Sequence, residues 1–440
     1  MKKILSAALL VFVLAGLGAT VTSAQFTSVT SFQVQNLSDQ TATIALVFYD
    51  ASGNEVVAAT VTDTIGGNLS KLYTQANNTN LPTGFNGSVV ISSDRPVAAI
   101  GIQEAKNASN KVYQGTYSGF GSDQASDTFY IPTVMKAFYG YTTQISVQNA
   151  GSTNVNVTIA YKGGYTDSVT GLKPGQVHRF DNASTPGMPS GYIGSATVAA
   201  TGGQVVAMVN QNNVAALQQQ TYEGFSAAGA GGTLYTPVLM RGFYGFNTSV
   251  QVQNIGAGSS LVEITYSNGV KSSRTIAGGD GFLFTQQNET RLPASWIGSA
   301  VITSASEDIV AVVNQQNAST GKAASYNAFA NTGTRFVGPN VMKAFYGFNT
   351  SVQVQNVGSP TTCTATFSNG TTQTSPTLNQ YGTFLFTQQN NAALGSSFIG
   401  SVSVTCGGQP MVAIVNQNGP DGAGDNAMAY NAIQAQAPVD

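Results

Sequence analysis

The stretch Gln251–Asn254, with the sequence QVQN, decides the fold because it recurs along the chain. The same four residues occupy Gln33–Asn36 and Gln353–Asn356, and a Ser-Val-Gln-Asn variant occupies Ser146–Asn149. The copies start at positions 33, 146, 251 and 353, so the steps between them are 113, 105 and 102 residues. Such a period indicates one structural unit used four times in tandem.

Two further landmarks recur in the same order within each unit. A Gly-Ser pair opens an alternating apolar run, and a pair ending in Gln closes the next apolar run. The Gly-Ser pairs are Gly87-Ser88, Gly194-Ser195, Gly298-Ser299 and Gly400-Ser401, and the later pairs are Ile102-Gln103, Asn210-Gln211, Asn314-Gln315 and Asn416-Gln417. We expect four domains at residues 25–122, 123–227, 228–332 and 333–440. We expect the late amide side chains to bond loop backbone groups rather than a ligand.

The local pattern within a unit is that of short β-strands. In the third unit Val262, Ile264 and Tyr266 alternate with polar residues, which indicates a strand with one buried face. Asn268-Gly269 follows and predicts a tight hairpin. The late run Ile309–Val313 is continuously apolar, as expected for a strand in the middle of a sheet. No helical stripe follows the first 24 residues, so the sequence predicts an all-β protein of four antiparallel β-sandwiches.

Each internal joint between units carries a proline-containing segment, followed by a Phe-Tyr-Gly triplet. These segments are Phe129–Met135, Leu234–Met240 and Phe336–Met342. The proline predicts an edge strand, and the short, partly hydrophobic joints predict domains packed end to end in a rod. There are four units but only three such segments. One terminal domain is therefore expected either to close itself with residues such as Gln25–Thr30, or to leave an open edge for another chain.

The first residues predict a secretory signal, because Lys2 and Lys3 precede the apolar run Ile4–Ala19 and small residues end at Ala24. Residues 1–24 are expected to be removed, and the alternative is a retained membrane anchor. The rest of the chain has no second long apolar stretch, so we expect no transmembrane segment in the mature protein. Only 8% of the residues are charged and the net charge is −2. This composition argues against nucleic acid as a partner and fits a secreted protein.

The chain has two cysteines, both in the fourth unit. Cys363 and Cys406 lie on different predicted strands, each on the face expected to point into the core. In a secreted protein this placement predicts a disulfide. Two buried free thiols, or a metal pair, are the alternatives, and two cysteines without a nearby histidine are a poor zinc site.

The sequence gives little support for catalysis. His178 is the single histidine and has no counterpart in the other units, so no repeated Ser-His-acid set is possible. We therefore expect no enzyme activity, no cofactor and no metal site. Asp421 and Asp425 share a loop that could hold calcium, but the set of ligands is incomplete and a plain turn is the preferred interpretation.

Aromatic residues are the remaining candidates for a binding role. Trp296, Tyr192, Phe85 and Phe398 share one position, directly before the Gly-Ser strand. Exposed rings in a row could stack on sugars, and this makes the four residues candidate contact residues. The competing interpretation, which we prefer, is that these rings and the Phe-Tyr-Gly triplets fill the ends of the sandwiches and the joints between them.

The order of these motifs resembles a known kind of repeat. The shared pattern runs from Tyr-x-Pro through FYGF-x-TSVQVQN and Ile-Gly-Ser to Val-Asn-Gln and Tyr-Asn-Ala-Phe. Over nearly all of residues 25–440 it resembles the Ig-like β-sandwich repeats of large secreted bacterial surface proteins. The resemblance implies a structural role at the cell exterior, with other copies of the chain as partners in a filament or surface layer. The alternative is a monomeric adhesin or carbohydrate-binding array with surface glycans as partners.

Overall fold

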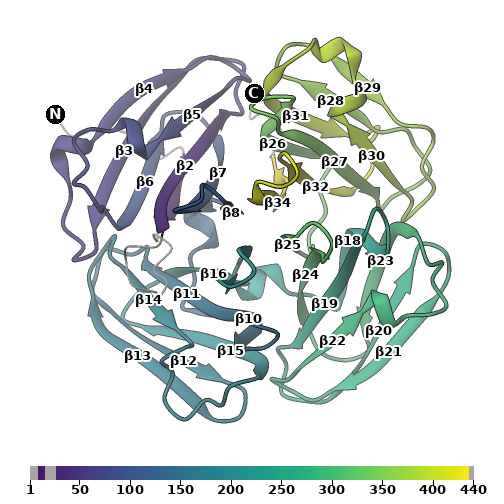
Figure 1. The fold of residues 1–440 in the computed structure, drawn as a ribbon, viewed down its shortest axis with the longest axis horizontal. Helices are drawn as coiled ribbons and strands as arrows, with labels where there is room; N and C mark the ends of the chain where they lie inside the picture. Colours follow the sequence, from purple (N-terminus) through teal and green to yellow (C-terminus); the bar gives the residue numbers. More distant parts are fainter. Residues whose placement is uncertain (1–7, 15–25, 436–440) are drawn as a thin grey trace.

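The computed structural model describes residues 8–14 and 26–435, and within them it contains β-strands and short 3-10 turns but no α-helix (Figure 1). The strands form eight sheets, which pair into four β-sandwiches. The all-β prediction is therefore confirmed. The 3-10 turns are Val57–Ala59, Gln75–Asn77, Ser122–Gln124, Ala227–Gly229, Gln286–Asn288, Gln388–Asn390 and Ala392–Leu394.

The third unit shows the plan of a sandwich. Its alternating residues Val252 and Ile264 are fully buried between the two sheets, and so is Val313 from the apolar late strand. That late strand is β24, which lies inside its sheet as predicted. The outer sheet has the order β18 (Thr233–Arg241), β23 (Trp296–Ser304), β20 (Ser260–Tyr266), β21 (Lys271–Ile276), and the inner sheet has the order β22 (Gly281–Thr285), β19 (Phe246–Asn254), β24 (Ile309–Asn317), β25 (Lys322–Asn327).

The second and fourth units repeat this order of strands. In the second unit the outer sheet is β10 (Thr128–Lys136), β15 (Tyr192–Thr201), β12 (Val155–Tyr161), β13 (Tyr165–Leu172), and the inner sheet is β14 (Val177–Asp181), β11 (Thr142–Asn149), β16 (Val205–Asn213), β17 (Gln218–Glu223). In the fourth unit the outer sheet is β29 (Thr372–Thr374), β28 (Thr364–Phe367), β31 (Phe398–Thr405), β26 (Arg335–Lys343), β35 (Ile433–Gln434), and the inner sheet is β30 (Thr383–Thr387), β27 (Asn349–Asn356), β32 (Met411–Asn418), β34 (Ala427–Asn431).

The first unit follows the same plan with two additions. Its outer sheet is β4 (Val61–Ile65), β3 (Ala42–Asp50), β6 (Gly87–Ser93), β1 (Ala8–Leu14), β9 (Phe120–Gly121). Its inner sheet is β33 (Gly424–Asp425), β8 (Val112–Ser118), β7 (Val97–Asn107), β2 (Phe26–Asn36), β5 (Ser70–Thr74), so a short strand of the fourth unit joins the sheet of the first.

The four sandwiches form a closed ring around one axis, which is lined by the inner strands β8, β17, β25 and β34 (Figure 1). The first and fourth units are in direct contact. The hydroxyl of Thr116 donates to the carbonyl of Ala429 at 2.8 Å, and β33 pairs in parallel with β8. The predicted end-to-end rod is therefore wrong. The short joints do pack the domains tightly, but each joint also turns the chain around the axis.

A repeated hydrogen bond crosses each joint and involves the serine of each Gly-Ser motif. The serine of each pair donates to a backbone carbonyl of the next unit, and the residue that carries this carbonyl has a positive φ each time. The four bonds are Ser88 to Gly175 (2.6 Å, φ 75°), Ser195 to Gly279 (3.1 Å, φ 70°), Ser299 to Tyr381 (2.7 Å, φ 63°) and Ser401 to Asn68 (3.5 Å, φ 58°). The last of them joins the fourth unit to the first, so the contact found at each internal joint also closes the ring.

The proline segments form β10, β18 and β26, each at or next to the edge of its outer sheet, and each contains a bulge at the proline. A buried tyrosine from the inner sheet bonds the backbone at this bulge. The hydroxyl of Tyr222 accepts from the amide of Thr133 at 3.3 Å and donates to its carbonyl at 2.8 Å. The proline lacks an amide proton, so the bulge is a position where its absence costs no ladder bond.

In the first unit the place of the proline strand is taken by β1, which lies within the predicted signal sequence. Its register against β6 runs from Ala8 opposite Ser93 to Leu14 opposite Gly87. The expected self-closure by Gln25–Thr30 is wrong for the described residues, because Phe26–Thr30 continue β2 and pair with Gln103–Asn107. The other residues of the predicted signal, 1–7 and 15–24, lie outside the described structure.

Candidate functional site

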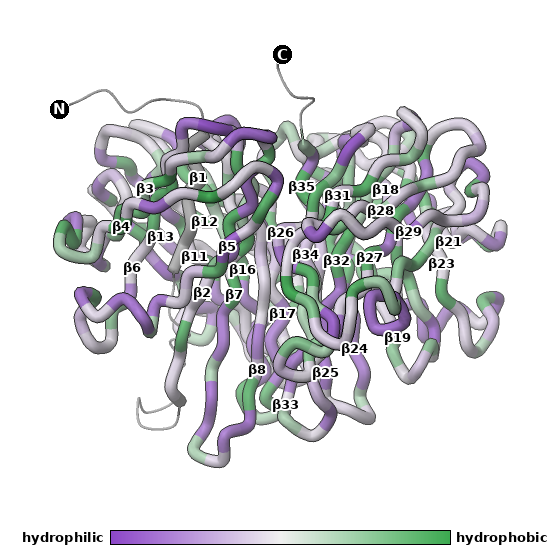
Figure 2. Tube along the Cα trace, turned by 90° about the horizontal axis from the view of Figure 1, so that it is seen from above, coloured by the Kyte–Doolittle hydropathy of each residue, from purple (hydrophilic) through white to green (hydrophobic). Residues whose placement is uncertain are grey.

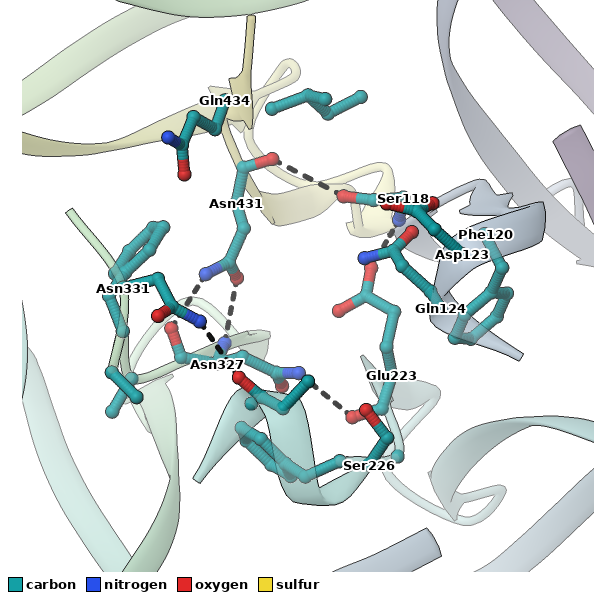
Figure 3. A pocket seen from close by; sticks show the side chains of 18 of the residues that line it. Ser118, Phe120, Asp123, Gln124, Glu223, Ser226, Asn327, Asn331, Asn431 and Gln434 are labelled. Carbon is teal, nitrogen blue, oxygen red and sulfur yellow. Dashed lines mark hydrogen bonds between the residues drawn. The ribbon is translucent and has the colours of Figure 1, made fainter. Parts of the chain in front are cut away.

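A cavity of about 410 Å³ opens at one end of the ring axis (Figure 3). Each inner strand that lines the axis contributes its last residue to the wall of this axial pocket. These equivalent residues are Ser118, Glu223, Asn327 and Asn431. Because the four positions carry three different residue types, they do not form a recurring motif, and sequence comparison between the units gave no signal for the pocket.

Hydrogen bonds connect the four residues in a circle. The amide of Ser118 donates to the carboxylate of Glu223, and the hydroxyl of Ser118 donates to the carbonyl of Asn431 at 3.2 Å. The side chain of Asn327 donates to the carbonyl of Glu223 at 2.8 Å. Asn327 and Asn431 exchange two bonds, at 2.8 and 2.7 Å. This circle ties all four units together at the pocket.

The wall of the pocket is partly aromatic and contains two acidic side chains. Asp123 and Glu223 are the only charged residues among those that line it, and the lining phenylalanines are Phe120, Phe129, Phe225, Phe329 and Phe336. Burial raises the pKa of Glu223 above its ordinary value, although the bond from the Ser118 amide acts in the opposite direction. The geometry suits a small molecule with hydrogen-bond donors, and it also serves as a structural clasp of the ring.

A buried carboxylate lies near the other end of the axis. The side chain of Asp425 accepts backbone amide protons from Gln219 at 3.0 Å, Ala323 at 2.9 Å and Ala427 at 3.3 Å, which belong to three different units. Burial raises its pKa to about 8. Asp421 instead forms an ion pair with Lys322 at 2.7 Å. Within residues 8–14 and 26–435 no group of three or more His, Cys, Asp or Glu side chains is placed to hold a metal.

The late amide pairs bond mainly across the joints between units, and not to loop backbone as expected. Asn210 donates to Gln103 of the first unit at 3.0 Å, and Gln315 donates to Asn416 of the fourth unit at 3.1 Å. Gln417 does bond a backbone carbonyl, that of Asn340 at 3.0 Å, but this carbonyl lies in strand β26 and not in a loop. The expectation was wrong for the other pairs, because the sequence of one unit does not show that its strand ends face a neighbouring unit.

The four predicted contact aromatics pack inward. Trp296 is 8% exposed and meets Tyr266 edge to face, with a centroid distance of 5.6 Å. Its ring covers Gly298, where an added Cβ would come within 2.5 Å of it. The other three rings form the same edge contact, Tyr192 with Tyr165, Phe85 with Phe48 and Phe398 with Phe367. The glycine of each Gly-Ser pair thus makes room for the preceding ring.

The most exposed aromatic rings of the described residues belong to the Phe-Tyr-Gly triplets. Tyr139, Tyr244 and Tyr346 are 86%, 84% and 85% exposed. The first lies in a two-residue hairpin turn, in which Phe138 and Tyr141 exchange backbone hydrogen bonds of 3.0 and 2.9 Å. The φ angles of Tyr139 and Gly140 are 47° and 84°, and the other two triplets repeat these values closely. Positive φ at both positions defines a type I′ turn, which strongly prefers Asn, Asp or Gly at the first position.

These three turns lie at the end of the ring opposite the axial pocket. Each turn directly follows a proline strand, and Phe129 at the start of the first proline strand lines the pocket. A strand of nine residues spans roughly 30 Å, so the turn is carried to the far end. Figure 2 shows the ring from the side, with β35 near the pocket end and β33 at the other. We name the surface formed by Tyr139, Tyr244 and Tyr346 the tyrosine face.

His178 and the two cysteines were also singled out in the sequence. The ring of His178 packs edge to face on Phe180, and burial lowers its pKa. Cys363 and Cys406 form a disulfide, as predicted. They flank paired strands, because Thr364 lies opposite Thr405.

No protein-family model matches the chain, and a search of curated proteins finds no match. No helix among the described residues is long and apolar enough to cross a membrane.

Proposed function

We propose that this chain is a secreted structural protein of the cell exterior that associates with its own copies through the tyrosine face. The observation that carries the proposal is the threefold repetition of an exposed tyrosine at a turn position that disfavours it. Strain of this kind indicates a role outside the fold when the local structure does not require the residue.

Tyrosine is less stable than asparagine in the backbone conformation of these turns. A positive φ costs a residue such as tyrosine roughly 1–2 kcal/mol, whereas asparagine tolerates it. The exposed ring makes one edge contact, with Phe138 in the first triplet, and otherwise faces solvent. Tyrosine rings on protruding turns are effective in protein contacts, because they supply contact area with few rotatable bonds. A contact between two copies of the tyrosine face would use the same surface on both copies, as in a twofold pair.

Three properties support the cellular setting. The first residues have the pattern of a removable secretory signal. The disulfide Cys363–Cys406 fits an oxidising compartment. The low charge of the chain leaves little repulsion between copies. The resemblance to Ig-like repeats of bacterial surface proteins agrees with this setting and motivates a filament or layer as the product.

The test uses the chain without residues 1–24 and a variant with Tyr139→Asn, Tyr244→Asn and Tyr346→Asn. We expect the wild-type protein to associate with increasing concentration in analytical ultracentrifugation, and the variant to lose this contact. We also expect the variant to melt at the same or a higher temperature, because asparagine suits the turn. This second readout separates a contact role from a structural one.

The matched control is Leu261→Asn, which removes a 51% exposed hydrophobic side chain from the outer sheet of the third unit. It should leave association unchanged. Unaltered association of the triple tyrosine variant would refute the proposal. A monomeric wild-type protein that binds a polysaccharide through these tyrosines would instead favour the adhesin.

A further inference from the structure

Three of the four sandwiches are completed by a proline strand that follows the preceding unit along the chain. In the first unit this place is held by Ala8–Leu14, which pairs with β6 on one side and with β9 on the other. These residues belong to the signal predicted to be removed on secretion. Removal would leave a gap between Gly87–Ser93 and Phe120–Gly121, which we name the strand slot.

The strand slot would be a two-sided acceptor for an extended chain. Every residue of Gly87–Ser93 is paired with β1, so its backbone groups on that side would lose their partners. Val89 and Ile91, which are fully buried in the complete unit, lie on this strand. Unpaired strand edges with an apolar face readily accept a strand from another chain.

We propose that in the leader-free protein the strand slot of one copy takes up the segment Gln436–Asp440 of a second copy. Ala435 stays in its own unit, where its amide donates to the carbonyl of Arg335 at 3.1 Å. The segment continues the run that starts at Ile433, in which Ile433, Ala435, Ala437 and Val439 alternate with Gln434, Gln436, Pro438 and Asp440. This alternation is the pattern of a strand with one buried face. The proposal extends the self-association proposed above by naming a second contact.

The segment also shares with the internal proline strands a proline and a position along the chain. Pro438 follows Ala437 and Ala435 at one and three residues, as Pro132 follows Ile131 and Phe129. The segment comes after β34, just as the internal proline strands come after β8, β17 and β25. It is therefore the fourth member of that series in chain order.

A second copy is favoured over the same chain as the source of the donor, because a connection within one chain would use up most of the segment. In the internal joint between the third and fourth units, five residues connect Phe329 to Arg335, where the proline strand begins. The residue equivalent to Phe329 is Ile433, since both pair with the proline strand of their own unit. The same joint within one molecule would use residues 434–438, so Pro438 would lie in the connection and not in the slot.

The position of donor and acceptor defines the product. Gln434 precedes the donor segment, and Phe120 lies in β9 beside the slot. Both residues line the axial pocket, so the donor and the acceptor lie at the pocket end of the ring. Reciprocal exchange would join two rings pocket to pocket in a twofold pair. The tyrosine faces would then point outward on both sides, and alternation of the two contacts would produce a linear filament.

The first experiment probes the slot with a peptide of the chain's own sequence, Thr128–Lys136 (TFYIPTVMK). We expect the labelled peptide to bind the leader-free protein at one saturable site per chain, and a scrambled peptide not to bind. Absence of binding would overturn the inference, and so would an exported protein that retains Ala8–Leu14 by mass spectrometry.

The second experiment tests the occupant by crosslinking in trans. By the register of β10, Ala437 would lie opposite Val89, as Ile131 lies opposite Ala196. We mix two leader-free variants, Val89→Cys and Ala437→Cys, and expect a covalent pair of chains after mild oxidation. A chain with both substitutions that closes only on itself would contradict exchange between copies.

The third experiment distinguishes failure of the strand slot from failure of the tyrosine face. Deletion of Gln436–Asp440 leaves the bond of Ala435 to Arg335 in place and should stop assembly at pairs joined by the tyrosine faces. The triple tyrosine variant should stop at pairs joined by strand exchange, and the two changes together should give monomers. If the deletion has no effect while the tyrosine variant loses assembly, the strand slot is refuted and the proposed function stands.

Discussion

At the scale of single residues, the buried amide and carboxylate side chains described above form hydrogen bonds that join separate segments of the chain. Asn254 is the last residue of the QVQN motif, and its buried side chain donates to the carbonyls of Gly258 at 2.8 Å and Ile276 at 3.0 Å. Its counterparts Asn149 and Asn356 bond two backbone carbonyls in the same way, one in the following loop and one at or after the end of a later strand. The motif was visible in the sequence, but the role of its asparagine required the positions of both carbonyls.

Asp425 gives a prediction about pH. Burial raises the pKa of Asp425 to about 8, whereas the ordinary pKa of an aspartate is near 4. Between about pH 4 and pH 8 the folded protein therefore holds a proton on this side chain that the unfolded chain releases. Stability from this group is therefore full below about pH 4 and declines as pH rises toward 8. We expect Asp425→Asn to flatten the fall of the melting temperature between pH 5 and 8, measured by calorimetry. An equal slope in both proteins would contradict the raised pKa.

At the scale of strands, the sequence predicted more than it did for single residues. The alternation in β20, the apolar run in β24 and the proline at the edge of β18 each appear where the pattern placed them. These features depend on neighbours within one strand, and such neighbours are visible in a sequence. The pairing of β1 with β6 joins residues about eighty positions apart and has no such local signal.

The tyrosine that bonds the proline strand gives the second prediction. The hydroxyl of Tyr326 accepts from the amide of Val238 at 3.3 Å and donates to its carbonyl, inside a fully buried site. Tyr326→Phe leaves both backbone groups without this partner and should lower the free energy of unfolding by about 1–3 kcal/mol. Tyr346→Phe is the matched control at an exposed ring and should change it by less than about 0.5 kcal/mol. Urea denaturation distinguishes the two results.

At the scale of the whole molecule, the number of units could be predicted from the sequence, but their arrangement could not. In the predicted rod only units adjacent in sequence were in contact, and contact between the first and fourth units was not expected. The joints of the ring carry hydrogen bonds of Ser88, Ser195, Ser299 and Ser401, and a sequence does not show that their acceptors lie in other units. The axial pocket was missed for the same reason, since it exists only where all four units meet.

A closed ring should unfold as one body, and this gives the third prediction. The disulfide closes a separation of 43 residues in the fourth unit, and chain entropy alone predicts a stabilisation of about 4 kcal/mol. We expect Cys363→Ala with Cys406→Ala to shift the entire calorimetric peak to lower temperature. In a chain of independent domains, roughly a quarter of the enthalpy would move and the peak would split.

The serine bonds also bear on how such a chain can change its length. Each bond joins one sandwich to the next at the same position, and four such bonds complete the circle. A chain that gained a fifth copy or lost one would have to close the circle with a different angle between neighbours, which would strain these bonds. We therefore expect sequence changes within a copy to be tolerated far more readily than a change in the number of copies.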